Sequence, residues 1–150
     1  MFWHKKDLNT RSDSTKRLAG QSSDRRVVER ALDEVKIFAC GCFDKASGSH
    51  GWDHTLRVFR LCEMLGPVEN ADMDVLSAAA YLHDIGIVEA EKKYNSTAPE
   101  YQHQEGPPIA REILIKLGAK EELVEEVCDI IGHHHQPRRE ESLNFQVVYD

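Results

Sequence analysis

Side chains that could bind a metal ion fall at or near the ends of three expected helices. His54 stands in the first turn of one helix, and the neighbours His83 and Asp84 end a second. His133 and His134 end a third. Each position continues an apolar stripe toward the protein interior. Because burial of several imidazoles and a carboxylate without a cation would leave costly unpaired polar groups, this pattern predicts a divalent-metal site.

The pair His83 and Asp84 needs a break in the helix to act on one ion, because neighbouring helical residues point about 100° apart. Gly86 follows closely and gives the backbone the freedom to turn there. The second oxygen of Asp84 could also bridge to another ion, as in two-metal hydrolysis with ions about 3.5–4 Å apart. We therefore expect Asp84 to be a catalytic residue as well as a ligand.

The helices that must position these residues show as apolar side chains at every third or fourth position. They are expected over roughly residues 24–43, 52–65, 72–85, 107–117 and 119–133. Pro107 and Pro108 should open the fourth helix, and Gly118 should end it. Residues 145–150 should begin another buried helix, with a short strand as the alternative. Residues 88–105 are polar and aperiodic, which predicts a long functional or mobile loop. The fold class is therefore all-α, a compact bundle of about five to six helices.

The first 23 residues differ in composition from the rest of the chain. They are polar, basic and without a sustained apolar period, which predicts a flexible N-terminal tail ahead of one domain at 24–150. Residues 1–30 hold eight Lys or Arg against four Asp or Glu, a local charge of +4. Because the net charge of the whole chain is −7, the residues after 30 carry a net charge of −11. A solvated extension is the expected role of the tail, and a basic arm for an acidic partner is the alternative.

Charge and cysteine usage exclude several classes of protein. A net charge of −7 argues against a surface built to grip DNA or RNA polymers. No apolar run approaches the roughly 20 residues that span a bilayer, and no signal-peptide pattern is present, so no membrane is expected. The four cysteines show no disulfide pattern, and all but Cys42 fall on apolar helix faces; they are Cys40, Cys42, Cys62 and Cys128. We expect free thiols in a reducing cytoplasm.

Two segments around the candidate ligands have a familiar form. Asp53–Val58 reads D-H-T-L-R-V, and Ala79–Gly86 reads A-A-Y-L-H-D-I-G. These resemble the D-H-x-x-R-V and A-A-x-L-H-D-I-G segments of the HD-domain superfamily of metal-dependent phosphohydrolases. Residues 105–110, 131–134 and 145–150 are also similar to members of that superfamily. The resemblance covers roughly Asp24 to the C-terminus and implies the all-helical HD fold.

The resemblance implies a first divalent ion held by His54, His83, Asp84 and a last aspartate. Relatives commonly read D-A-D in that last region, with the second Asp as the ligand, and this chain stops at the first, Asp150. Two alternatives stay open: Asp150 takes the place of that ligand, or the domain is truncated and the ligand lies beyond the chain end.

A second ion is the arrangement of two-metal members of the superfamily. There a histidine before the fourth helix and a His-His pair after the fifth bind it, and His103 and His133-His134 lie at those places. Glu105 is a rival to His103 as a ligand. In the alternative with one ion, His103 and His135 are surface histidines.

The resemblance implies hydrolysis of a phosphate ester, of a nucleotide or related small molecule, by attack of metal-bound hydroxide. His and Asp ligands suit Fe, Mn, Zn or Co better than Mg, although Mg can occupy a mononuclear version. Arg57, one turn beyond His54, is expected to hold the phosphate and assist catalysis. Its alternative role is an ion pair with Asp53 or Asp84. Lys92 and Lys93 could close over the anionic substrate from the expected long loop.

Two other functions fit the same resemblance. Some HD-fold proteins use a di-iron centre to activate oxygen, and others are non-catalytic modules that sense nucleotides. The Gly-Tyr-Pro motif of members that act on cyclic dinucleotides is absent after His134, where the chain reads Gln136-Pro137-Arg138-Arg139.

Overall fold

A computed structural model of the 150-residue chain describes residues 11–44, 51–136 and 142–148. The chain divides into two units, residues 1–31 and 32–150. The described part of the first unit belongs to α1 (Arg11–Phe43), which begins well before the start expected at Asp24. Residues 11–23 of the expected tail are therefore helical. No proline interrupts them, and a helix that is already nucleated extends at little cost through polar residues.

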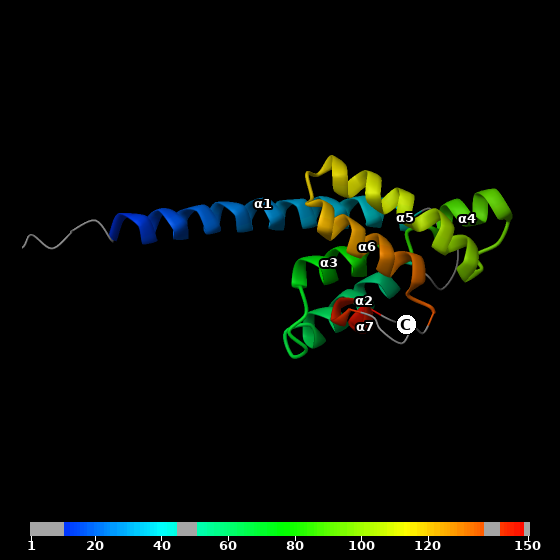
Figure 1. Cartoon of the computed structure of the whole chain (residues 1–150). Helices are drawn as coiled ribbons and strands as arrows, with labels where there is room; N and C mark the ends of the chain where they lie inside the picture. The colour runs from blue at the N-terminus through cyan, green and yellow to red at the C-terminus, as the bar shows by residue number, and fades with distance from the viewer. Residues whose placement is uncertain (1–10, 45–50, 137–141, 149–150) are drawn as a thin grey trace, which may run out of the picture. The chain divides into compact units, whose positions relative to one another are not determined.

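The described residues of the second unit form helices and turns, which confirms the all-α prediction (Figure 1). The helices after α1 are α2 (Trp52–Leu65), α3 (Met73–Leu82), α4 (Ile87–Tyr94), α5 (Pro99–Lys116), α6 (Glu121–His133) and α7 (Leu143–Val148). Of the two expectations for residues 145–150, the helix is confirmed over Phe145–Val148, whereas 149–150 lie outside the described residues. No helix of the described part of the chain is both long and apolar enough to cross a membrane.

Helix α3 is the central element of the second unit and packs against α2, α6 and α7. Seven of its ten residues are buried. Asp72 caps its first turn by accepting hydrogen bonds from the backbone N–H groups of Asp74 and Val75. Asn144 of α7 accepts from the Asp72 N–H at 2.7 Å and donates to Glu126 of α6 at 2.8 Å. Because α3 is buried, the residues that directly follow it also lie in the interior.

The prediction of a long loop over residues 88–105 is wrong. Helix α4 occupies Ile87–Tyr94, and α5 already begins at Pro99. The two helices hold each other through tertiary contacts, because Tyr94 stacks on Tyr101 with ring centroids 4.3 Å apart and Lys93 forms an ion pair with Glu105 at 2.7 Å. Asn95 at φ 51° ends α4 in the left-handed conformation typical of a helix C-terminus.

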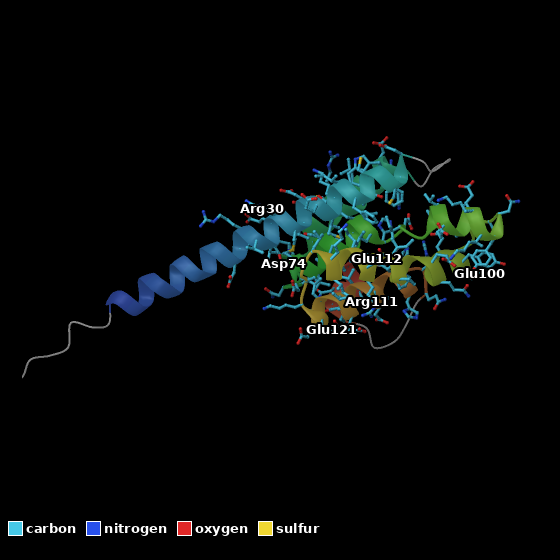
Figure 2. The ribbon with its side chains drawn as sticks, turned by 90° about the horizontal axis from the view of Figure 1, so that it is seen from above. Arg30, Asp74, Glu100, Arg111, Glu112 and Glu121 are labelled. Atoms are coloured by element: carbon cyan, nitrogen blue, oxygen red, sulfur yellow. The ribbon has the colours of Figure 1, made fainter. Side chains whose placement is uncertain are left out.

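The expected helix start at Pro107-Pro108 is also wrong, because both prolines lie inside α5. Contacts on both sides support the helix through this region. Gly106 packs closely on Gly86, and on the other side the Cys128 thiol donates to the Pro107 carbonyl at 3.5 Å. Farther along, Arg111 of α5 bonds Glu121 and Glu125 of α6 at 3.2 and 2.7 Å (Figure 2). Gly118, at φ 77°, lies just past the end of the helix, where the sequence placed it.

The cysteines of the described residues are free thiols, as expected. Cys62 and Cys128 are buried, whereas Cys40 and Cys42 are only half-buried. Burial raises the pKa of Cys62 to about 11.

Candidate metal centre

The first ligand group consists of His54 from the first turn of α2 and of His83 and Asp84 directly after α3. Nε2 of His54 lies 3.2 Å from Nε2 of His83, and Asp84 Oδ2 lies 3.5 and 3.2 Å from these two atoms. Three ligand atoms at the usual bond length of about 2.0–2.2 Å around one ion lie roughly 3–3.5 Å from one another. The spacing of this group therefore fits a single ion.

Aromatic packing sets the rotation of α2 that turns His54 toward His83. Tyr81 of α3 stacks with Trp52 and Phe59 of α2, at centroid distances of 6.0 and 4.3 Å. Trp52 and Phe59 lie two turns apart on the same face of α2, so rotation of the helix would break both contacts. His83 and Asp84 are 2% and 1% exposed.

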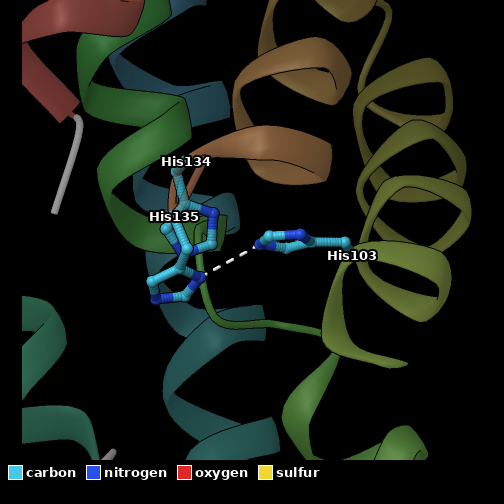
Figure 3. Close-up of side chains that lie close together, drawn as sticks. All are labelled: His103, His134 and His135. Atoms are coloured by element: carbon cyan, nitrogen blue, oxygen red, sulfur yellow. Dashed lines mark hydrogen bonds between the residues drawn. The ribbon is translucent and has the colours of Figure 1, made fainter. Parts of the chain in front are cut away.

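The second ligand group consists of His103 from α5 and of His134 and His135 at the end of α6 (Figure 3). Nε2 of His103 lies 3.0 Å from Nδ1 of His135, and the rings of His134 and His135 are 3.9 Å apart. Burial, followed by the charges of His134 and His135, lowers the pKa of His103 to about 4. His103 is therefore neutral at pH 7, the form that binds a metal ion.

Asp84 connects the two groups. Its Oδ2 faces His54 and His83, and its Oδ1 lies 3.4 Å from Nε2 of His134. Burial alone would raise the pKa of Asp84, but the adjacent imidazoles of His134 and His83 outweigh burial and hold that pKa well below its usual range. Asp84 is thus an ionised carboxylate with one oxygen toward each group, as in a bridging ligand.

Hydrogen bonds on the far side of two imidazoles test whether a cation fits between them and Asp84. Nδ1 of His83 lies 2.8 Å from the Ala80 carbonyl, and Nδ1 of His134 lies 3.0 Å from the Ile131 carbonyl. Each Nδ1 must therefore carry the proton that it donates, so Nε2 of a neutral ring presents a lone pair to the Asp84 carboxylate. His134 Nε2 has no hydrogen-bond partner in the described residues. A cation between the lone pairs and the carboxylate resolves this repulsion, and metal-binding histidines show the same outer hydrogen bond. The residues present fit a bound metal ion.

The structure turns His133 away from the other histidines. Its Nδ1 lies 2.9 Å from the Asp129 carbonyl and 3.2 Å from the Asp129 carboxylate, and the side chain is 39% exposed. The described residues therefore bring together His134 and His135, not the expected pair His133-His134. His134 continues the buried face of Val127, Ile130 and Ile131. This helical spacing is visible in the sequence, and it would have shown that the expected pair of histidines was placed one residue too early.

The expected substrate-binding residues lie on helices α2 and α4. Arg57 is exposed and forms no ion pair within the described part of the chain, so Asp53 and Asp84 are not its partners. Lys92 is 66% exposed and lies 3.7 Å from Glu89. Lys93 is bound to Glu105 at 2.7 Å.

The sequence also suggested two carboxylates as metal ligands, Glu105 and Asp150. Glu105 accepts hydrogen bonds from Lys93 and Tyr94, and the hydrogen bond from Lys93 lowers its pKa. These bonds occupy the carboxylate that the sequence left open as a rival to His103. Asp150 lies outside the described residues, so its part in the first ligand group stays a prediction.

Comparison with protein families adds to this geometry. The HD domain family matches residues 51–150, two thirds of the chain, and includes every ligand described above. The chain belongs to the HD-domain family, whose members are in general metal-dependent hydrolases. Comparisons with curated proteins and with solved structures find no match.

Proposed function

We propose that the chain is a metal-dependent phosphohydrolase with two ions bridged by Asp84, acting on a phosphate ester of a nucleotide or a related small molecule. The observation that carries the proposal is the position of Asp84, whose two oxygens face two separate groups of histidines. His54 and His83 would complete the first group, with a last aspartate such as Asp150. His103, His134 and His135 would complete the second.

Bound divalent ions supply an activated water and withdraw charge from a phosphoryl oxygen. The side chains provide a fixed cradle for this chemistry, because the outer hydrogen bonds of His83 and His134 lock both rings. Three imidazoles in the second group favour Fe, Mn, Zn or Co over Mg, which prefers oxygen ligands.

The exposed guanidinium of Arg57 favours the proposal that the substrate is an anion. It lies one turn after His54 on α2 and has no carboxylate partner in the described residues, so it is available to bind a phosphate through two N–H groups. Lys92, which is more exposed than Lys93 and less closely paired, is the second candidate for this role. The net charge of −11 beyond residue 30 agrees with a small substrate in place of a nucleic-acid polymer.

The proposal is tested by metal analysis of the purified protein and by a phosphatase screen across nucleotides with added Mn, Co or Mg. Variant H83A should lose metal and activity together. Variant H133A is the matched control, since His133 is a neighbouring histidine bound to Asp129. Unchanged metal content and activity in H83A would refute the site.

The nitrogen-rich second group keeps a di-iron oxygenase as the second candidate, because imidazole ligands suit iron well. Oxygen consumption and a mixed-valent iron signal, without release of phosphate, would favour that function. Nucleotide affinity with neither product would favour a sensing module.

A further inference from the structure

His103 differs from the buried ligands His83 and His134 in the surroundings of its outer ring nitrogen. Nδ1 of His83 lies 2.8 Å from the Ala80 carbonyl, and Nδ1 of His134 lies 3.0 Å from the Ile131 carbonyl. Nδ1 of His103 is closed off from solvent and has no hydrogen-bond partner in the part of the chain that the structure describes. Such outer hydrogen bonds fix the tautomer of a metal-binding histidine and raise its basicity. His103 therefore lacks a support that the other two rings have.

The inner nitrogen of His103 already has a partner in the metal-free protein. Its Nε2 lies 3.0 Å from Nδ1 of His135, as the dashed line in Figure 3 marks. At this distance one of the two nitrogens donates a hydrogen bond to the other. The bond joins α5 to the turn after α6, within the second ligand group.

These contacts decide which nitrogen of a neutral His103 carries the proton, because a neutral imidazole has only one N–H. With the proton on Nε2, His103 donates to His135, and Nδ1 is left as an unpaired acceptor. With the proton on Nδ1, a buried N–H group would have no acceptor within the described residues. Unpaired buried N–H groups are rarer in proteins than unpaired acceptors. We therefore expect the Nε2–H form of His103 in the metal-free protein.

Metal binding requires the opposite tautomer. The nitrogen of His103 that faces the second ligand group is Nε2, and a metal ligand must offer a lone pair there. The proton must then move to the buried Nδ1, where none of the described residues accepts it, and the hydrogen bond to His135 is lost. His134 meets no such cost, since the Ile131 carbonyl already holds its proton on Nδ1.

We propose that His103 is an exchangeable ligand of the second ion, held less firmly than His134 and the first of the histidines to leave. This inference rests on the two-ion centre of the proposed function. Outer hydrogen bonds are worth about 10- to 100-fold in metal affinity, so His103 should contribute less than His134 by about this factor. The His103 ring is also half-exposed, whereas His134 is fully buried. Exchange between a one-ion and a two-ion centre would begin at His103.

NMR of nitrogen-labelled histidine rings in the full chain tests the tautomers at neutral pH. Without metal, His103 should carry its proton on Nε2, whereas His83 and His134 should carry it on Nδ1. Saturating Zn should move the His103 proton to Nδ1 and leave the other two tautomers unchanged. Variant H103N assigns the signals of His103. A proton on Nδ1 of His103 without metal, or an Nε2 proton that persists with Zn, overturns the proposal.

Calorimetric titration with Zn compares the two ligands within the same group. H134N should lower the affinity for the second ion by about 100-fold, and H103N by about tenfold or less. Both variants should bind the first ion like the wild-type protein, which shows that the fold is retained. H133N is the control and should bind both ions normally, because His133 is bound to Asp129.

The same titration separates this inference from the proposed function. Equal losses in H103N and H134N overturn the exchangeable ligand and leave the two-ion centre intact. A wild-type protein that binds only one ion, or none, overturns the two-ion centre and the inference with it.

Discussion

The two ligand groups differ in how firmly the fold holds them. His83 and Asp84 follow the buried helix α3 and are almost fully enclosed, and two aromatic contacts from α2 set the position of His54. In the second group only His134 is fully buried, whereas His103 and His135 are half-exposed. The first group is therefore a rigid part of the core, and the second depends on the end of one helix. Among the described residues of these two groups, Asp84 is the one whose two oxygens face both.

This difference predicts that Asp84 and its neighbours have unequal effects on metal binding. The largest effect should come from D84N, which keeps the shape of the side chain but removes the charge from both groups. We expect loss of both ions and a fall in kcat/KM of at least about 100-fold, since even residues that only support ligands contribute 10- to 100-fold. Metal content and kcat/KM are measured together.

The control for D84N is D53N, which removes an exposed carboxylate one residue before His54. It should keep both ions and near-normal activity. Retention of one full equivalent of metal in D84N would show that the two groups are independent and that Asp84 does not bridge them.

The second prediction separates the groups by comparing H134N with H133N. H134N removes the buried imidazole beside Asp84 Oδ1 and should lower affinity for the second ion by about 100-fold while the first ion stays bound. H133N changes an exposed residue bound to Asp129 and should bind both ions normally. Calorimetric titration with Zn or Co measures both sites. If both variants lost affinity for the second ion equally, His133 would have to be a ligand as well.

The sequence located the first group more fully than the second for a physical reason. His54, His83 and Asp84 lie at helix ends that apolar periodicity marks directly. The second group depends on how the last turn of α6 closes, where a shift of one residue exchanges His133 for His135. Contacts between α4 and α5 also override the local signal of Pro107 and Pro108, and such tertiary contacts leave no periodic pattern.

Gly86 shows the same limit of local reasoning. The sequence suggests that this glycine frees the backbone after Asp84, but its φ of −74° is open to any residue. Its role is close approach: a Cβ there would collide with the Gln102 carbonyl and lie 2.6 Å from the Gly106 nitrogen. The glycine thus lets α5, which carries His103, approach the chain next to Asp84.

The third prediction tests that approach with G86A, which should push α5 away from Asp84. We expect a loss of about 1–3 kcal/mol in the free energy of unfolding, the usual cost of overpacking, and weaker binding of the second ion. Urea unfolding and metal titration measure the two effects. G41A is the control, because a Cβ at that exposed helical position meets no atom within 4 Å and should be neutral or slightly stabilising. A neutral G86A would show that the contact can relax.

The smallest effect concerns the pH dependence of the metal-free protein. The pKa of His103 falls from 6.5 to about 4 on folding, so the unfolded chain binds a proton first as the pH decreases. Stability should therefore fall between about pH 6.5 and 4, by on the order of 1 kcal/mol after allowance for partial exposure of the ring. Asp84, whose pKa lies below its usual 3.8, affects stability only at lower pH. Thermal unfolding with a chelator should show a smaller decrease in Tm from pH 7 to pH 5 for H103Q than for the wild-type protein. The exposed control H133Q should keep the wild-type slope, and an unchanged slope in H103Q would mean that His103 is not held neutral by its surroundings.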